Sequence, residues 1–308
     1  MSGNIIIILY GVWTLLCIAS FIVWLLTKTM PLKDHHELVQ RTKSWWTMLG
    51  IFTIAFVTSH TISYIFLGFI SFLALKEYFS MIPIRRADRR VLFWVYIAIP
   101  IQYYWAGKGW FGMFIIFIPV FMFLFIPFRL VISQQTEGFL KSVGTIQWGL
   151  MITVFALSHM AYLLSLPNLE QVPMTGAGLL LYLVFLTQFN DVAQYTSGKL
   201  FGKHKITPSV SPKKTWEGFL GGVLITTSLA LLIHPLITPF SYSTAIYSGL
   251  IISISGFIGD ITISAVKRDL AIKDTGSLIP GHGGILDRVD SLTYAAPLFF
   301  HFVYYLYY

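Results

Sequence analysis

The apolar residues of this chain are collected into long runs, and this grouping limits its fold more than any other feature. A hydrocarbon core about 30 Å thick is crossed by roughly 20 apolar residues in a helix. With 56% hydrophobic and 11% charged residues, a soluble globule would expose too much apolar surface. We therefore expect an all-α, polytopic integral membrane helical bundle with about nine to ten transmembrane helices. The runs lie at about 4–26, 45–58, 61–79, 91–106, 110–128, 145–166, 174–190, 216–237, 243–260 and 291–307.

The apolar stretch from Trp45 to Phe79 is too long for a single crossing. At about 1.5 Å per residue, one helix of this length would overshoot the hydrocarbon core by more than about 20 Å. The polar residues 58–61, Thr-Ser-His-Thr, lie near its middle. We therefore predict a helical hairpin that is broken near these residues.

Basic residues are unevenly distributed between alternate connections. If Met1 is outside, every Lys and Arg except Lys108 falls in an inner connection, at about 27–44, 76–90, 129–144, 191–215 and 261–290. Short cytoplasmic loops of membrane proteins carry this excess of basic residues. We therefore interpret the net charge of +8 first as a topology signal, and we expect no nucleic-acid partner. The expected location is the bacterial inner (plasma) membrane, with the active site facing the cytoplasm.

Four aspartates lie at one membrane depth. Asp191 and Asp260 each end an apolar run at its inner side, and Asp287 and Asp290 precede the last run. Anions at this depth are costly unless they are paired or bind a cation. If the helix continues past Asp260, then Asp260, Ser264 and Lys267 share one face. Hard carboxylate oxygens of this kind suit Mg²⁺, which is usually held by one or two carboxylates together with substrate phosphates.

A glycine-rich stretch, residues 280–284 with the sequence PGHGG, lies between these aspartates. It is too rich in glycine to be helical, and its backbone N–H groups could approach a phosphate closely. Flanked by paired carboxylates and basic residues, it indicates phosphoryl or nucleotidyl transfer. A solvated loop whose basic residues Lys267, Arg268 and Lys273 contact lipid headgroups is the alternative.

A second basic cluster lies upstream, in residues 198–205 and 211–218. Ser211 followed by Pro212 is typical of a helix start, with serine as the N-cap and proline at the first helical position. Lys213 and Lys214 would then lie in the first helical turn and could bind a polyphosphate. The alternative is that the two lysines only hold the helix end at the membrane interface.

Together these stretches resemble one known family. Residues 264–268 (SAVKR), Lys273-Asp274 and residues 280–290 (PGHGGILDRVD) are similar to the C-terminal signature of phosphatidate cytidylyltransferases, the CDP-diacylglycerol synthases. Residues 198–206 (GKLFGKHKI) and 211–222 (SPKKTWEGFLGG) also resemble that family. The specific match covers roughly residues 191–297. It departs from the family pattern at Gln194, where a small residue is usual, and this puts the identity of the substrate in doubt more than the reaction.

The resemblance implies a nucleotidyltransferase that transfers a cytidylyl group from CTP to phosphatidic acid, giving CDP-diacylglycerol and pyrophosphate for phospholipid biosynthesis. Mg²⁺ or Mn²⁺ would be held by Asp260, Asp287 and Asp191. The expected catalytic residues are Lys267, Arg268, His282, Arg288 and Asp290. The expected substrate-binding residues are Ser211, Lys213, Lys214, Ser264, Lys273, Gly283 and Gly284.

We expect residues 1–190 to form a transmembrane scaffold, and residues 191–308 a transmembrane catalytic region with cytoplasmic loops 191–215 and 261–290. The expected partners are CTP, phosphatidic acid and membrane lipids, and a homodimer is left open. Two alternatives remain: a cytidylyltransferase that acts on another lipid phosphate, and a non-catalytic paralogue that binds lipid or nucleotide. A transporter is disfavoured, because its charges would be expected near the bilayer midplane on broken helices.

Overall fold

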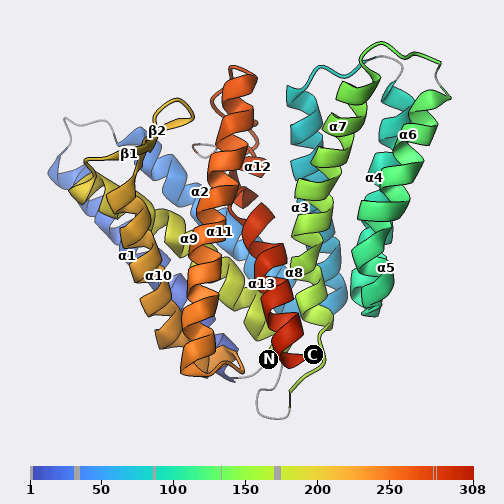
Figure 1. Cartoon of the computed structure of the whole chain (residues 1–308). Helices are drawn as coiled ribbons and strands as arrows, with labels where there is room; N and C mark the ends of the chain where they lie inside the picture. Colours follow the sequence, from blue (N-terminus) through green and yellow to red (C-terminus); the bar gives the residue numbers. More distant parts are fainter. Residues whose placement is uncertain are drawn as a thin grey trace.

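The computed structural model describes residues 3–30, 35–85, 88–132, 134–169, 175–279, 281 and 283–308. Nearly all of its regular structure is helical, and the long helices run side by side as a bundle (Figure 1). The first half comprises α1 (Gly3–Thr29), α2 (His36–Thr58), α3 (His60–Met81), α4 (Arg89–Lys108), α5 (Phe111–Ile116), η2 (Phe117–Met122), α6 (Phe123–Val131), α7 (Phe139–Leu150), η3 (Met151–Phe155) and α8 (Ala156–Ser165). The second half comprises α9 (Thr175–Phe201), β1 (Lys205–Thr207), β2 (Ser211–Thr215), α10 (Trp216–Ile237), α11 (Tyr242–Asp269), α12 (Leu286–Val289) and α13 (Leu292–Tyr307).

Seven helices in the described part of the chain are long and apolar enough to cross a membrane. They are α1, α3, the continuous helix Phe111–Val131, the continuous helix Phe139–Ser165, α9, α10 and α11. The expected count of nine to ten is therefore not confirmed. The other three expected spans correspond to α2, α4 and α13, which are helices but do not meet both conditions; α13, for example, has only 16 residues.

The predicted break in the first hairpin is confirmed. Helix α2 ends at Thr58 and α3 begins at His60. Ser59 between them is extended, and its hydroxyl accepts a hydrogen bond from the backbone N–H of Ile62. A serine N-cap of this kind satisfies one of the free N–H groups of a new helix. Ser59 therefore ends α2 and starts α3 as a separate helix.

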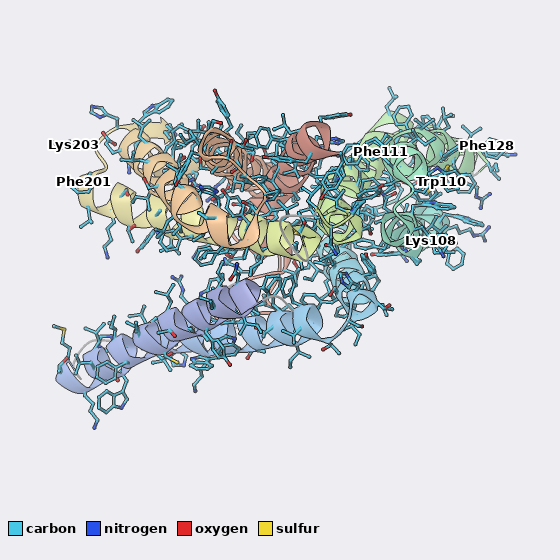
Figure 2. All side chains as sticks on the ribbon, turned by 90° about the horizontal axis from the view of Figure 1, so that it is seen from below. Lys108, Trp110, Phe111, Phe128, Phe201 and Lys203 are labelled. Carbon is cyan, nitrogen blue, oxygen red and sulfur yellow. The ribbon has the colours of Figure 1, made fainter. Side chains whose placement is uncertain are left out.

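The core of the bundle is formed around α8, α9 and α13. Tyr182 of α9 stacks on Phe299 of α13, and both side chains are fully buried. By contrast, α1 keeps most of its apolar side chains exposed, as expected of a helix that faces lipid. Seen from below, α1 and α2 lie along one flank of the bundle (Figure 2).

Helices α9 and α10 approach each other closely through glycines. A Cβ atom on Gly218 would lie 3.0 Å from the Cα of Gly198, and one on Gly222 would overlap the side chain of Gln194. Small residues permit such close backbone packing between membrane helices. This contact holds the end of α9, which carries Asp191, next to the start of α10.

The expected helix start at Ser211 is wrong. Ser211–Thr215 is strand β2, which pairs antiparallel with β1, with Thr207 opposite Ser211 and Lys205 opposite Thr215. Helix α10 begins only at Trp216, and the hydroxyl of Thr215 accepts the N-capping hydrogen bond from Gly218 N at 3.2 Å. The ladder with β1 favours the extended form of Ser211–Thr215. Lys213 and Lys214 therefore lie on a strand and not in a helical turn.

The connections rich in basic residues lie at the upper end of the bundle in Figure 1, with the β1–β2 hairpin, and the two termini lie at the lower end. Lys108 ends α4 at the lower end, next to Gly109 in the left-handed conformation. The grouping of basic connections at one end agrees with the expected topology. The predicted domain boundary between residues 190 and 191 falls inside α9.

Candidate active site

Three carboxylates from three different segments meet at the upper end of the bundle. Asp191 comes from α9, Asp260 from α11, and Asp290 follows α12. Ser291 connects two of them, because its hydroxyl donates to Asp191 Oδ1 at 3.1 Å and its backbone N–H donates to Asp290 Oδ1 at 2.7 Å. Gly259 allows α11 to pack closely against the backbone at Asp290, since a Cβ atom at position 259 would lie 2.5 Å from the carbonyl oxygen of Asp290.

The surroundings of Asp290 are unfavourable for a negative charge. Its side chain is only 8% exposed. Burial, and then the negative charges of Asp260 and Asp191, raise the pKa of Asp290 well above its ordinary value. These mutually repelling carboxylates would be stabilised by a nearby positive charge.

Two lysines neutralise part of this charge. The Nζ of Lys214 lies 2.5 Å from Asp260 Oδ2, and the Nζ of Lys267 lies 2.8 Å from Asp287 Oδ1. Side chains on a strand alternate between its faces, so Lys214 points into the site while Lys213 is exposed. The predicted helical face of α11 is present, since α11 continues to Asp269 and Ser264 donates to Asp260 Oδ1 at 3.3 Å.

The second oxygen of Asp287 organises the glycine-rich segment. Asp287 Oδ2 accepts hydrogen bonds from Thr275 N at 2.8 Å, the Thr275 hydroxyl at 2.9 Å and Gly284 N at 3.0 Å. Gly283 has a φ of +80°, and a Cβ atom on it would lie 2.7 Å from Asp287 Oδ2. Burial acts to raise the pKa of Asp287, but the Lys267 ammonium and these donors outweigh it, so the pKa lies below its ordinary value.

The other expected site residues lie around this centre. The Nε of Arg268 donates to the carbonyl oxygen of Val210 in the β1–β2 turn at 3.0 Å. Arg288 interacts electrostatically with Asp191, and within the described residues its buried Nε has no hydrogen-bond partner. Ser211 is half-buried on β2, and Lys273 is exposed. His282 lies outside the described residues.

Sequence reasoning missed Glu77, Thr275 and Ser291. Glu77 lies near the C-terminal end of α3, and its carboxylate accepts hydrogen bonds from Ile285 N at 2.9 Å and Leu286 N at 2.8 Å. Glu77, like Asp191 and Asp260, is an acidic residue at the inner side of an apolar run, here the run at about 61–79, and it could have been predicted on that basis. Thr275 and Ser291 carry no comparable signal, because a hydroxyl beside a glycine or an aspartate is common.

The carboxylates of this cluster provide oxygen donors of the kind that divalent cations take in proteins. Among the described residues, no three His, Cys, Asp or Glu side chains are arranged to hold a metal ion by themselves. Mg²⁺ commonly takes only one or two protein carboxylates and completes its shell with water and phosphate oxygens. The side chain of Asp260 is 24% exposed, so one of the carboxylates can be reached from solvent.

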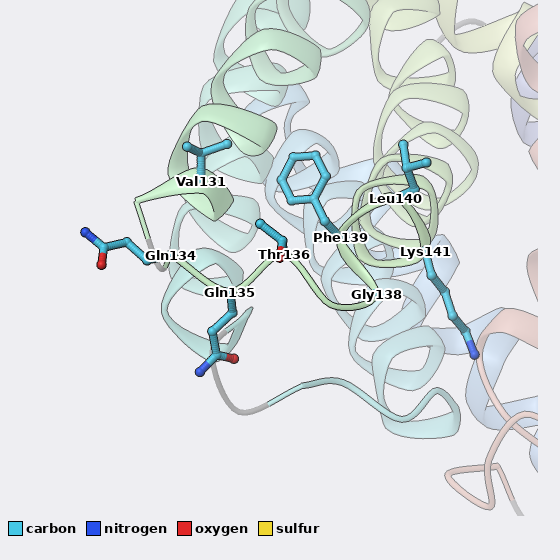
Figure 3. Close-up of a pocket in the computed structure, with 8 residues that line it drawn as sticks. All are labelled: Val131, Gln134, Gln135, Thr136, Gly138, Phe139, Leu140 and Lys141. Atoms are coloured by element: carbon cyan, nitrogen blue, oxygen red, sulfur yellow. The ribbon is translucent and has the colours of Figure 1, made fainter.

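A separate pocket lies at the same end of the bundle but away from this cluster. It has a volume of about 470 Å³ and is lined by the end of α6, the following connection and the start of α7 (Figure 3). Its lining includes none of the expected site residues. This pocket is therefore separate from the carboxylate–lysine cluster.

Comparison with known proteins finds matches to most of the chain and to parts of it. Residues 39–306 match the model of the "Cytidylyltransferase family". The chain is 42% identical over 295 residues to "Uncharacterized protein YnbB" of Escherichia coli, covering 95% of this chain and 96% of that protein. It is 42% identical over 147 residues to the phosphatidate cytidylyltransferase of Haemophilus influenzae (44% of this chain, 48% of that protein). It is also 37% identical over 140 residues to that of Mycobacterium leprae (46% and 45%).

Proposed function

Because the chain belongs to the cytidylyltransferase family, whose members are nucleotidyltransferases, we propose that it transfers the cytidylyl group of CTP to phosphatidic acid, giving CDP-diacylglycerol and pyrophosphate. The alignments with relatives named phosphatidate cytidylyltransferase span about half of their length. The observation that carries the proposal is the cluster in which Asp191, Asp260 and Asp290 interact beside Lys214 and Lys267. Seven helices in the described part of the chain are long and apolar enough to span a membrane, where a lipid substrate would be found.

The reaction explains why the site is rich in charge but needs no strong base. The second ionisation of a phosphate monoester lies near pKa 6, so the lipid phosphate is already a nucleophile at neutral pH. One of its oxygens attacks the α-phosphorus of CTP, and the bond from that phosphorus to the α–β bridging oxygen breaks. Pyrophosphate leaves with the electron pair. The main barrier is the repulsion between two polyanions.

The basic residues would reduce this repulsion by placing positive charge next to the phosphates. Lys214 and Lys267 are already ordered by Asp260 and Asp287, and in the presence of substrate their ammonium groups would contact phosphate oxygens. Arg288, with a buried Nε that has no partner among the described residues, would donate to the lipid phosphate. Arg268 and Lys273, together with Lys213 on the outer face of β2, would attract the triphosphate.

We propose Asp260, Asp287 and Asp191 as the ligands of Mg²⁺ or Mn²⁺, with Asp290 beside them. When bound, the ion would neutralise charge on the phosphate oxygens. The carboxylates provide hard oxygen donors, and Ser291 holds Asp191 and Asp290 in place. The N–H groups of Thr275 and Gly284 hold Asp287.

A second candidate substrate is another lipid phosphate. The chain aligns over nearly its whole length with the protein YnbB, whose name states no substrate. Gln194 lies beside the site: its Oε1 is 3.5 Å from the Nζ of Lys214, and its buried Nε2 has no hydrogen-bond partner among the described residues. A side chain at this position would change which headgroup or chain fits next to Lys214.

The proposed function predicts that the purified protein converts labelled CTP into a labelled liponucleotide when phosphatidic acid is supplied in detergent micelles. The same assay should include an ether-linked lipid phosphate and a polyprenyl phosphate, with diacylglycerol as a control that lacks the nucleophilic phosphate. Transfer to phosphatidic acid above all others supports the proposal. Transfer to another lipid phosphate selects the second candidate, and the absence of transfer to every lipid phosphate contradicts both.

The proposed orientation predicts that the β1–β2 hairpin faces the cytoplasm. Cysteines would be placed at Lys203, next to β1, and at Tyr242, at the opposite end where α11 begins and where the side chain is 73% exposed. Cys17 would first be changed to serine. We expect a membrane-impermeant maleimide added to intact cells whose outer membrane has been made permeable to label position 242 and not position 203, since basic connections remain inside. The reverse pattern would invert the topology.

A further inference from the structure

Resting on the proposed function, we propose that Glu77 is a positioning residue for cytidylyl transfer, which holds one segment, described at residues 275–279 and 283–287, in its reactive arrangement. Glu77 comes from the scaffold half of the chain, 208 residues before its hydrogen-bond partner Ile285. Its carboxylate contacts the backbone of this segment, and glycines of the segment leave space for that carboxylate.

Each oxygen of Glu77 has a defined partner in the segment. Oε1 accepts from Ile285 N at 2.9 Å, and Oε2 accepts from Leu286 N at 2.8 Å. These N–H groups lie at the start of α12, which carries Asp287 and Arg288. A carboxylate that accepts two adjacent N–H groups determines both the position and the direction of the backbone that donates them.

Glu77 is also connected to Asp287 through Thr275. The Thr275 hydroxyl, which has one proton to donate, lies 2.9 Å from Asp287 Oδ2 and 3.4 Å from Glu77 Oε2. Asp287 in turn pairs with Lys267. Glu77 therefore reaches Asp287, which pairs with Lys267, through one intervening side chain.

The glycines of the segment leave room for this carboxylate. A Cβ atom on Gly284 would overlap Glu77 Oε2 and the Thr275 hydroxyl, and one on Gly276 would lie 3.0 Å from Glu77 Oε1. Contacts this short would displace the carboxylate. The glycine at position 284 is thus explained by the approach of Glu77, as well as by a need for phosphate to approach the backbone.

The stability of α3 does not explain a glutamate at this position. Glu77 lies near the C-terminal end of α3, the negative end of the helix dipole, where an acidic side chain is not favoured. The neighbouring Leu75 and Tyr78 are buried in the core, so this turn is a rigid base. A charge that is unfavourable for its own helix but satisfied by a distant loop points to a role in that loop.

The first test measures order in the segment without any need for activity. A spin label would be attached at Leu278→Cys, where the native side chain is 58% exposed, in a Cys17→Ser background. We expect Glu77→Gln to increase the mobility of this label, because the amide can accept fewer of the hydrogen bonds. The matched control is Asp88→Asn, which removes another carboxylate at the same end of the bundle, a buried one that is bonded to Arg85 and Ser142 instead of this segment. Asp88→Asn should leave the label as in the wild-type protein.

The second test measures turnover in the same variants. We expect Glu77→Gln to lower kcat by about 10- to 100-fold, the usual effect of losing a group that orients a catalytic side chain, while KM for CTP changes by less than about threefold. In a double-mutant cycle, Glu77→Gln and Thr275→Val should be non-additive, since both act through Asp287. Asp88→Asn and Thr275→Val should be additive.

Each outcome decides the question. Unchanged label mobility in Glu77→Gln, or a loss of kcat matched by Asp88→Asn at equal folded fraction, overturns the positioning role. If Glu77→Gln does not fold, Gly276→Ala crowds the same carboxylate and should raise the label mobility in its place. If the wild-type protein transfers no cytidylyl group to any lipid phosphate, the proposed function fails, and the spin label alone decides whether Glu77 orders the segment.

Discussion

Asp260→Asn and Asp287→Asn should each lower turnover by at least about 1,000-fold while the protein still folds and inserts into the membrane. Asparagine keeps the size of the side chain and its ability to accept a hydrogen bond, but removes the negative charge. The two aspartates accept from Lys214 and Lys267, and Asp287 also accepts from Thr275 and Gly284. The loss of charge should therefore weaken the binding of a cation and also the ion pairs with the two lysines.

Metal dependence separates these two effects. We would titrate Mg²⁺ and Mn²⁺ against the residual turnover of each purified variant, with Asp88→Asn as the control for removal of a buried carboxylate that lies outside the cluster. A large rise in the metal concentration that gives half-maximal activity indicates that the mutated aspartate is a ligand. Wild-type metal dependence in Asp287→Asn, with activity only scaled down, would assign Asp287 to holding Lys267 and the glycine-rich segment. The same result in both variants would contradict metal binding by either aspartate.

Lys214→Ala should raise KM for CTP by about 10- to 100-fold and change KM for phosphatidic acid much less. A hydrogen bond to a charged group contributes about 1.5–3 kcal/mol, and each ~1.4 kcal/mol corresponds to a tenfold change in affinity. The alanine variant also leaves Asp260 without its lysine, but that side chain is 24% exposed and can be solvated. Steady-state kinetics with each substrate varied in turn measure the two KM values.

The neighbouring lysine provides the control for this prediction. Lys213 lies on the same strand, carries the same charge and is exposed on the opposite face. Lys213→Ala should have a clearly smaller effect on KM for CTP, and that effect should weaken further as salt is added. Equal effects of the two substitutions would mean that the hairpin attracts nucleotide only by its overall charge. A loss confined to phosphatidic acid would reassign Lys214 to the lipid headgroup.

The local parts of this fold could be predicted from the sequence, because the information lies in neighbouring residues. Apolar runs of sufficient length predict helices, and the polar residues 58–61 predict the break between α2 and α3. The shared face of Asp260, Ser264 and Lys267 follows from helical periodicity once α11 continues to Asp269. The expected count of nine to ten crossings is not confirmed, because α2, α4 and α13 are helices that are not both long and apolar enough to span a membrane.

The active-site arrangement was decided by contacts between distant segments. Ser211 and Pro212 have the residue types of a helix start, but pairing with β1 makes them part of a strand, and this turns Lys214 toward Asp260 and Lys213 outward. Glu77 meets Ile285 across 208 residues, and no local pattern connects them. The sequence by itself determined most of the helices, through the lengths of its apolar runs. Tertiary packing determined which charges face one another, because a buried charge takes its partner from whatever segment is packed against it.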